Sequence, residues 1–146
     1  MASKVLVLLQ LTTIAALLWP WGAAAWNPWA WLPIALASAL AAWAVASNPP
    51  TNFSIFPEPR ANARLITAGA YSRLRHPMYT ALGLYALGCV IGWNTPWHWL
   101  SGLALAAVLD VKSRREERFL HARFPGYAAY AARTPRFVPR LRSVAR

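Results

Sequence analysis

The sequence predicts an all-α integral membrane protein with about four transmembrane helices and a cytoplasmic C-terminal amphipathic helical segment. Hydrophobic residues make up 58% of the 146 residues and charged residues only 13%, and a water-soluble domain of this length cannot bury so much apolar surface. The single cysteine excludes a disulfide scaffold. We expect one membrane domain, 1–146, whose apolar runs lack lysine and arginine and cover residues 5–21, 29–46, 79–93 and 97–111.

The first two runs approach the roughly 20 residues that a membrane-spanning helix needs. A cleaved signal peptide is the alternative for 5–21, because Lys4, a short apolar stretch and the small residues Ala23, Ala24 and Ala25 resemble the three regions of such a peptide. The cluster at residues 19–21, Trp-Pro-Trp, favours a retained helix, since tryptophans are typical of the membrane–water interface and a second run follows almost at once.

The later segments follow in order. Residues 48–76 contain four prolines and no long apolar run, so they predict an ordered polar loop that leads, through residue 78, into the third run. Runs 79–93 and 97–111 are joined by a turn that fits only a tight helical hairpin, and at about 15 residues each their helices must extend past the hydrocarbon or thin it locally. The basic, aromatic segment 112–146 suits a surface of anionic lipid.

The net charge of +11 is segregated along the chain. Lysines and arginines stand before the first run, between the second and third, and after the fourth, where Lys112 and nine arginines lie; the connections 20–28 and 94–96 contain none. Four spans therefore place every basic segment on one side, which the positive-inside rule assigns to the cytoplasm together with both termini. Cleavage of the first run would put the 48–76 loop and the tail on opposite sides, against this rule.

Candidate chemistry lies near the predicted cytoplasmic face. Proline is favoured at the first position of a helix, so Pro77 makes His76 the expected N-cap of the third helix. A helix start attracts anions, and Arg75 and His76 beside it could hold a carboxylate or a phosphate. The alternative is that both side chains face lipid head groups.

Three of the four acidic residues stand close together near the end of the fourth run. Asp110 has Arg114 one helical turn away, which favours a structural ion pair. A surface ion pair between Lys112 and Glu116, four residues apart on a helix, would explain the presence of one glutamate. It explains less well why two glutamates, Glu116 and Glu117, stand side by side.

Other motifs favour structural roles or exclude functions. The pattern GxxxG at 88–92 predicts the close approach of a neighbouring helix, and Trp97, His98 and Trp99 predict an interfacial anchor on the outer side. The absence of GxGxxG, P-loop, CxxC pair and HExxH motifs excludes nucleotide binding by a Rossmann or P-loop domain. We expect no nucleic-acid partner and no metal, although the tail composition alone would fit nucleic acid.

Several blocks, in this order and spacing, resemble the isoprenylcysteine carboxyl methyltransferase and phospholipid methyltransferase superfamily. They cover about residues 48–140 and read LITAGAY (65–71), RHPMY (75–79), EERFL (116–120), FPGY (124–127) and RFVP (136–139), with NFS (52–54) and PEP (57–59) similar to bacterial members. The resemblance implies an integral enzyme of a bacterial inner membrane. It would bind S-adenosylmethionine without a Rossmann domain, between the cytoplasmic ends of the last helices and the C-terminal segment.

The resemblance also implies roles for single residues. The implied cofactor contacts are Arg64, Leu65, Ile66, Tyr71, His76, Pro77, Met78, Tyr79, Glu116 and Glu117, of which His76, Tyr79 and Glu116 are expected to act in catalysis. In the carboxyl methyltransferases an arginine one turn before the first glutamate contacts the substrate, and here Lys112 holds that position. A lysine keeps the charge but lacks the planar two-point grip on a carboxylate.

The leading hypothesis is a S-adenosylmethionine-dependent methyltransferase acting on a lipophilic or membrane-delivered acceptor at the cytoplasmic face. A carboxylate acceptor needs no base, whereas an amine or a thiol must lose a proton to His76, His121 or an acidic side chain. A non-enzymatic membrane interaction or lipid-binding protein that retains the fold is the alternative, favoured by the lysine at position 112. A transporter is a more remote alternative, because no polar pathway crosses any run.

Overall fold

The computed structural model describes residues 2–22 and 25–139, and in this part of the chain the regular secondary structure is helical, without strands. It has five α-helices and three short 3-10 turns: α1 (Ala2–Leu18), η1 (Pro28–Ala30), α2 (Trp31–Ala46), η2 (Pro50–Asn52), η3 (Gly69–Ser72), α3 (Pro77–Trp93), α4 (Pro96–Arg123) and α5 (Tyr127–Arg133). The all-α prediction is confirmed for these residues. Ala23 and Ala24 of the signal-peptide alternative, and three tail arginines at 140, 142 and 146, lie outside the described residues.

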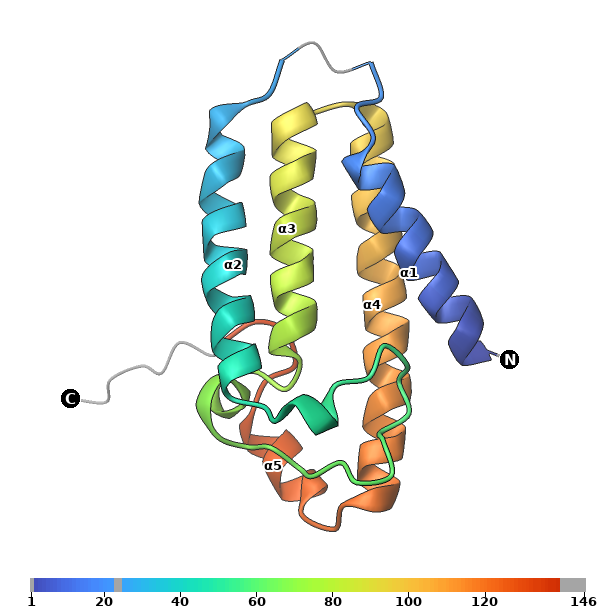
Figure 1. The fold of residues 1–146 in the computed structure, drawn as a ribbon, viewed down its shortest axis with the longest axis vertical. Coiled ribbons are helices and arrows are strands. Elements are labelled where there is room, and N and C mark those ends of the chain that lie inside the picture. Colours follow the sequence, from blue (N-terminus) through green and yellow to red (C-terminus); the bar gives the residue numbers. More distant parts are fainter. Residues whose placement is uncertain (1, 23–24, 140–146) are drawn as a thin grey trace, which may run out of the picture.

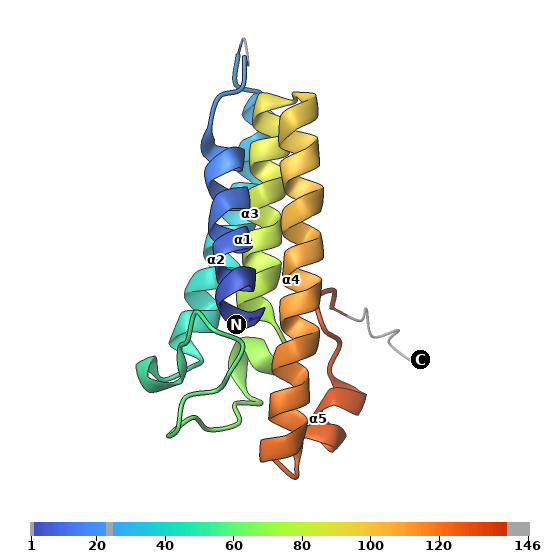
Figure 2. The ribbon, with the colours of Figure 1, turned by 90° about the vertical axis from the view of Figure 1, so that its right-hand side faces the viewer.

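The four long helices form an elongated bundle (Figure 1). α2 packs on α3, α1 packs on α4, and α3 joins the two pairs by also packing on α4. Figures 1 and 2 show the end of α1, the start of α2 and the uncharged connection from α3 to α4 at one end of the bundle. The loop between α2 and α3, the second half of α4 and α5 lie at the opposite end, which is the basic end of the molecule.

Proline positions set the helix boundaries. α1 ends at Leu18 because Pro20 lacks an N–H donor and its ring disfavours helical backbone at Trp19. The first helix therefore covers 2–18 instead of the predicted 5–21. α3 begins at Pro77 with His76 as its N-cap, as predicted, and Asn94 ends it in the left-handed conformation at φ 46°.

α4 is longer than the apolar run inside it. It continues for 28 residues, so the predicted span 97–111 is its first half and a charged half follows. By length and composition, only the stretch Pro28–Ala46 among the described helices is long and apolar enough to cross a membrane. Ser3–Leu18 and Pro77–Trp93 are shorter apolar helices. Four long helices are present, and this criterion supports one of them as a span.

Small residues let α2 and α3 approach closely. A methyl group added to Gly88 would lie 2.5 Å from Cγ1 of Ile34 and 3.2 Å from the carbonyl oxygen of Ala30. This proximity agrees with the role predicted from the GxxxG pattern, because no larger side chain fits at position 88 without movement of α2.

The prediction for His98 was wrong. Trp97 and Trp99 are exposed, as an interfacial anchor requires, but the side chain between them is fully buried. His98 shares a hydrogen bond of 2.8 Å between Nδ1 and Oγ1 of Thr95, and its Nε2 lies 3.0 Å from the carbonyl oxygen of Trp19. The Trp19 carbonyl also accepts from the N–H of Trp21 over 2.9 Å, so the imidazole adds a second hydrogen bond that joins the chain just after α1 to the start of α4.

Candidate active site

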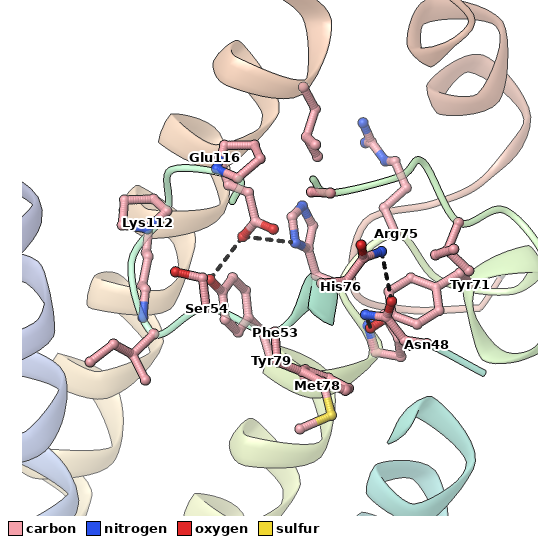
Figure 3. A pocket seen from close by; sticks show the side chains of 18 of the residues that line it. Asn48, Phe53, Ser54, Tyr71, Arg75, His76, Met78, Tyr79, Lys112 and Glu116 are labelled. Carbon is pink, nitrogen blue, oxygen red and sulfur yellow. Dashed lines mark hydrogen bonds and ion pairs between the residues drawn. The ribbon is translucent and has the colours of Figure 1, made fainter. Parts of the chain in front are cut away.

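A cavity of about 430 Å³ lies at the basic end of the bundle (Figure 3). Its walls come from α1, the end of α2, the loop 48–66, the start of α3, the middle of α4 and the region of α5. This volume lies within the range of pockets that hold cofactors and small ligands.

Most predicted site residues meet in this cavity. Nine of the ten implied cofactor contacts line it, and so does the implied substrate contact: Arg64, Leu65, Ile66, Tyr71, His76, Pro77, Met78, Tyr79, Glu116 and Lys112. Two candidates do not line it. Glu117 lies behind His76, and the ring of His121 packs edge-on against Tyr127, with 4.7 Å between the ring centroids.

Glu116 is one of two acidic residues that line the cavity (Figure 3), and the other, Glu58, pairs with Arg115 at 3.6 Å. The Tyr79 hydroxyl donates to its Oε2 over 2.8 Å, and Nδ1 of His76 is 3.8 Å from the same oxygen. The rings of His76 and Tyr79 are parallel, with 5.3 Å between centroids. Because both aromatic side chains come from the first turn of α3, this turn fixes the carboxylate on α4.

Glu117 has a different role from the one predicted. Its side chain is 9% exposed, and its carboxylate accepts from His76 over 3.0 Å and from Arg136 over 2.8 and 3.1 Å, with Arg75 at 3.2 Å. Burial alone would raise the pKa of Glu117, but hydrogen bonds from His76 and Arg136, and then the charges of His76 and Arg75, lower it to about 2. Glu117 therefore supports the cavity wall from behind as an ionised group.

Some of the backbone N–H groups at the start of α3 already donate to carbonyl oxygens of the C-terminal segment. The N–H groups of Arg75 and His76 donate to carbonyl oxygens of residues 135 and 136 over 2.9 and 3.2 Å. The next two N–H groups, of Met78 and Tyr79, have no hydrogen-bond acceptor among the described residues, and the His76 side chain does not cap them. The expected anion site is thus reduced to these two donors.

Lys112 closes the cavity on the side of α1. It is 2% exposed, and its Nζ donates to Oε1 of Gln10 over 2.5 Å and lies 5.6 Å from the centre of the Tyr79 ring. Burial lowers the pKa of Lys112, and the charge of Glu116 opposes this effect. No carboxylate of the described residues is within 4.0 Å of Lys112, so the ion pair with Glu116 considered from the sequence is absent from the described structure.

Two asparagines hold the loop over the cavity: Asn48, which was not singled out from the sequence, and Asn52, which was quoted only as part of the NFS block. The side chain of Asn52 accepts from the backbone N–H of Arg64 over 3.0 Å and donates to its carbonyl oxygen over 2.9 Å. Asn48 donates to the hydroxyl of Tyr71 over 3.1 Å, and Tyr130 donates to the Tyr71 carbonyl over 2.7 Å. Asparagines four residues apart directly after an apolar run were the available signal.

Comparison with known proteins matches this site to a family. The profile described as phospholipid methyltransferase matches residues 26–126, which include the whole loop over the cavity and the helices α3 and α4 that carry Tyr79 and Glu116. The chain belongs to the phospholipid methyltransferase family. This membership confirms the resemblance to the superfamily and implies methyltransferase activity in general. Helix α1 and the segment after residue 126 lie outside the match.

Two curated proteins share part of the chain. The chain is 42% identical over 84 residues to the cobalt-zinc-cadmium resistance protein CzcN of Cupriavidus metallidurans, a match that covers 56% of the chain and 38% of CzcN. It is 38% identical over 84 residues to the nickel-cobalt-cadmium resistance protein NccN of Alcaligenes xylosoxydans xylosoxydans, covering 56% of the chain and 39% of NccN. The matched part thus spans about two fifths of each relative. No solved structure matches the chain.

Proposed function

We propose that this member of the phospholipid methyltransferase family is an integral membrane enzyme that uses S-adenosylmethionine to methylate a lipophilic acceptor. The observation that carries the proposal is the setting of Glu116. Its carboxylate faces the cavity and accepts from Tyr79, and no arginine or lysine of the described residues lies within 4.0 Å of it. A carboxylate without an arginine or lysine partner among the described residues, in a cavity of a strongly basic chain, favours a cationic ligand.

The residues present fit this cofactor. Glu116 would hold its ammonium group or its ribose hydroxyls, and the N–H groups of Met78 and Tyr79 would hold its carboxylate. The faces of the Tyr71 and Tyr79 rings would lie near the sulfonium, because aromatic faces attract cations. The bound cofactor supplies an activated methyl group, and the protein aligns the acceptor with it and excludes water.

The acceptor would approach from the side of α1 and Lys112. This wall combines the buried ammonium group with apolar side chains of Val7, Leu11 and Leu82. A cation without a carboxylate partner in the described structure favours an acceptor with an anionic or electron-rich head, and the apolar wall favours a lipophilic body. A carboxylate acceptor would need no base, whereas for a thiol or an amine His76 is the base nearest to the cavity wall.

Exposed apolar side chains support a membrane location. Large hydrophobic residues on three of the long helices are more than half exposed, including Leu8, Leu32, Leu36, Leu100 and Leu103. A surface of this kind would drive association in water, whereas a bilayer covers it without cost. With the positive-inside rule, the basic end and its cavity would face the cytoplasm, in a bacterial inner membrane.

Binding and transfer to an acceptor can be tested separately. We expect the purified full chain in detergent to bind S-adenosylhomocysteine in calorimetry, and Glu116→Gln to weaken this binding at least about tenfold. Arg118→Gln, an exposed neighbour on α4, is the matched control and should bind like the original protein. Membranes incubated with a radiolabelled methyl donor should transfer label to a lipid-soluble product. A protein that binds no S-adenosylhomocysteine would refute the proposal and favour the non-enzymatic alternative.

A contribution to metal resistance is a second candidate function, favoured by the names of CzcN and NccN. The described residues contain no group of three histidine, cysteine or acidic side chains placed to hold a metal ion. We therefore expect any such contribution to act through methyl transfer. Growth of a deletion strain on cobalt, zinc and cadmium should then be restored by the original gene and by Arg118→Gln, but not by Glu116→Gln. Equal rescue by Glu116→Gln would contradict this expectation.

A further inference from the structure

Arg136 joins the C-terminal segment to the charged cluster behind the cavity. It lies beyond α5 and outside the residues that the family profile matches. Its Nε and Nη2 contact the two oxygens of Glu117 at 3.1 and 2.8 Å, and its Nη1 lies 3.3 Å from Oδ1 of Asp110. One guanidinium thus grips two carboxylates, and it grips Glu117 at both oxygens.

The backbone around Arg136 is fixed to the start of α3. Carbonyl oxygens of Pro135 and Arg136 accept from the N–H groups of Arg75 and His76, and the carbonyl of Phe137 accepts from Oγ1 of Thr80 over 3.0 Å. In Figure 2 the segment after α5 turns back along α4. These three hydrogen bonds give the short segment one position relative to α3, so the guanidinium is held where it meets Glu117.

Glu117 connects Arg136 to the cavity through the side chain of His76. Its Oε1 lies 3.0 Å from Nε2 of His76, whose side chain is 4% exposed. The opposite nitrogen of the same ring faces Glu116, and the ring stacks on Tyr79 and contacts Phe137, with 5.9 Å between the latter centroids. The His76 ring therefore transmits any rotation of the Glu117 carboxylate to both cavity residues.

We propose that Arg136 is a positioning residue of the methyltransferase site: it fixes the Glu117 carboxylate, which orients the His76 ring toward Glu116 and Tyr79. This inference rests on the proposed function, because the geometry so fixed is that of the cofactor wall. The two-point grip explains why an arginine stands here, since a lysine ammonium offers no planar pair of donors. Arg75 carries the same charge but approaches only Oε1, at 3.2 Å, so it cannot set the carboxylate plane.

The test is the affinity of the full chain in detergent for S-adenosylhomocysteine, measured by calorimetry at pH 7.5. We expect Arg136→Gln to weaken binding at least about tenfold and Arg136→Lys to recover only part of this loss. Arg133→Gln is the matched control, because Arg133 is an exposed arginine of the neighbouring α5 with no carboxylate within 4.0 Å among the described residues. It should bind like the original protein. Circular dichroism verifies that each variant is folded at the assay temperature.

A double-mutant cycle separates positioning from general support. If Arg136 acts through Glu117, Arg136→Gln should weaken binding by less than about threefold when Glu117→Gln is already present. An equal loss in both backgrounds would overturn the proposal. Acid pH gives a second readout: without Arg136 the pKa of Glu117 rises, so Arg136→Gln should lose affinity at a higher pH than the original protein during acidification. If affinity falls at the same pH in Arg136→Gln as in the original protein, the proposal is also overturned.

The outcome distinguishes this inference from the proposed function. Binding by the original protein that is lost in Glu116→Gln, with Arg136→Gln and Arg136→Lys unchanged, would refute positioning by Arg136 and leave the methyltransferase proposal intact. Absence of binding in the original protein would refute the proposed function itself. Should Arg136→Gln not fold, Arg136→Lys keeps the charge, and full affinity in that variant would count against the two-point grip.

Discussion

Replacing Glu117 by glutamine is expected to cost about 3 kcal/mol of unfolding free energy at neutral pH. Burial of this side chain, 9% exposed, would raise its pKa, but His76 and the two arginines reverse the effect and lower it from an ordinary 4.5 to about 2. That difference corresponds to roughly 3 kcal/mol in favour of the ionised folded state. Because the folded pKa is depressed, the stabilisation is complete above about pH 4.5 and is lost as the pH falls toward 2.

The measurement is urea unfolding in a non-ionic detergent, followed by circular dichroism at pH 7 and at pH 3. The difference between the original protein and Glu117→Gln should shrink to less than half by pH 3, since Glu117 is then almost fully protonated in the unfolded chain, where its pKa is the ordinary 4.5, and still mostly ionised in the folded one. Glu58→Gln is the control: Glu58 is 41% exposed and pairs with Arg115 at 3.6 Å, and such surface pairs contribute less than about 1 kcal/mol. A loss for Glu117→Gln that is below about 1 kcal/mol, or that is the same at both pH values, would refute this reasoning.

Three further results are expected. Tyr79→Phe removes the hydroxyl that donates to Glu116 over 2.8 Å and should weaken S-adenosylhomocysteine binding about fivefold, the value of one net hydrogen bond; unchanged affinity in calorimetry would contradict this. Gly88→Ala should destabilise the protein by about 1–3 kcal/mol in urea unfolding, because the added carbon would lie 2.5 Å from a side chain of α2, whereas Gly83→Ala, with nothing within 4 Å, should be neutral or slightly stabilising. A C-terminal reporter fused to the chain should be active only in the cytoplasm, and activity outside it would overturn the predicted topology.

The helices could be predicted from the sequence because their apolar runs are separated by prolines and charges. The predicted start of α3 agrees with the structure, because Pro77 itself occupies the first helical position. The predicted end of the first helix was too late, because Pro20 also disfavours helical backbone at the residue before it, and α1 ends at Leu18. The pairing of α1 with α4 and of α2 with α3 could not be predicted. Each run is apolar on all sides, so no stripe of residues marks the face that meets a neighbour.

Most residues of the cavity could be predicted from motifs, but which of them face the cavity and which support it from behind could not be predicted. Adjacent residues on a helix point about 100° apart, so the pair Glu116 and Glu117 must face different surroundings, and the sequence does not say which one faces the cavity. In the structure Glu117 is the one that meets Arg136, a residue that reaches α4 only after the chain turns back beyond α5. The contact of Gln10 with Lys112 could not be predicted either, because it joins residues 102 positions apart in the sequence.

The charges of the described site explain how a chain of net charge +11 can offer a negative surface to a ligand. Asp110 and Glu117 are neutralised by arginines, and Lys112 is turned toward Gln10. Glu116 is left with the Tyr79 hydroxyl at 2.8 Å and the His76 imidazole at 3.8 Å, and no arginine or lysine of the described residues lies within 4.0 Å of it. Among the described residues, the arginines of the basic end thus pair with Glu117, whose carboxylate contacts the His76 ring, and leave the neighbouring carboxylate of Glu116 without a guanidinium partner.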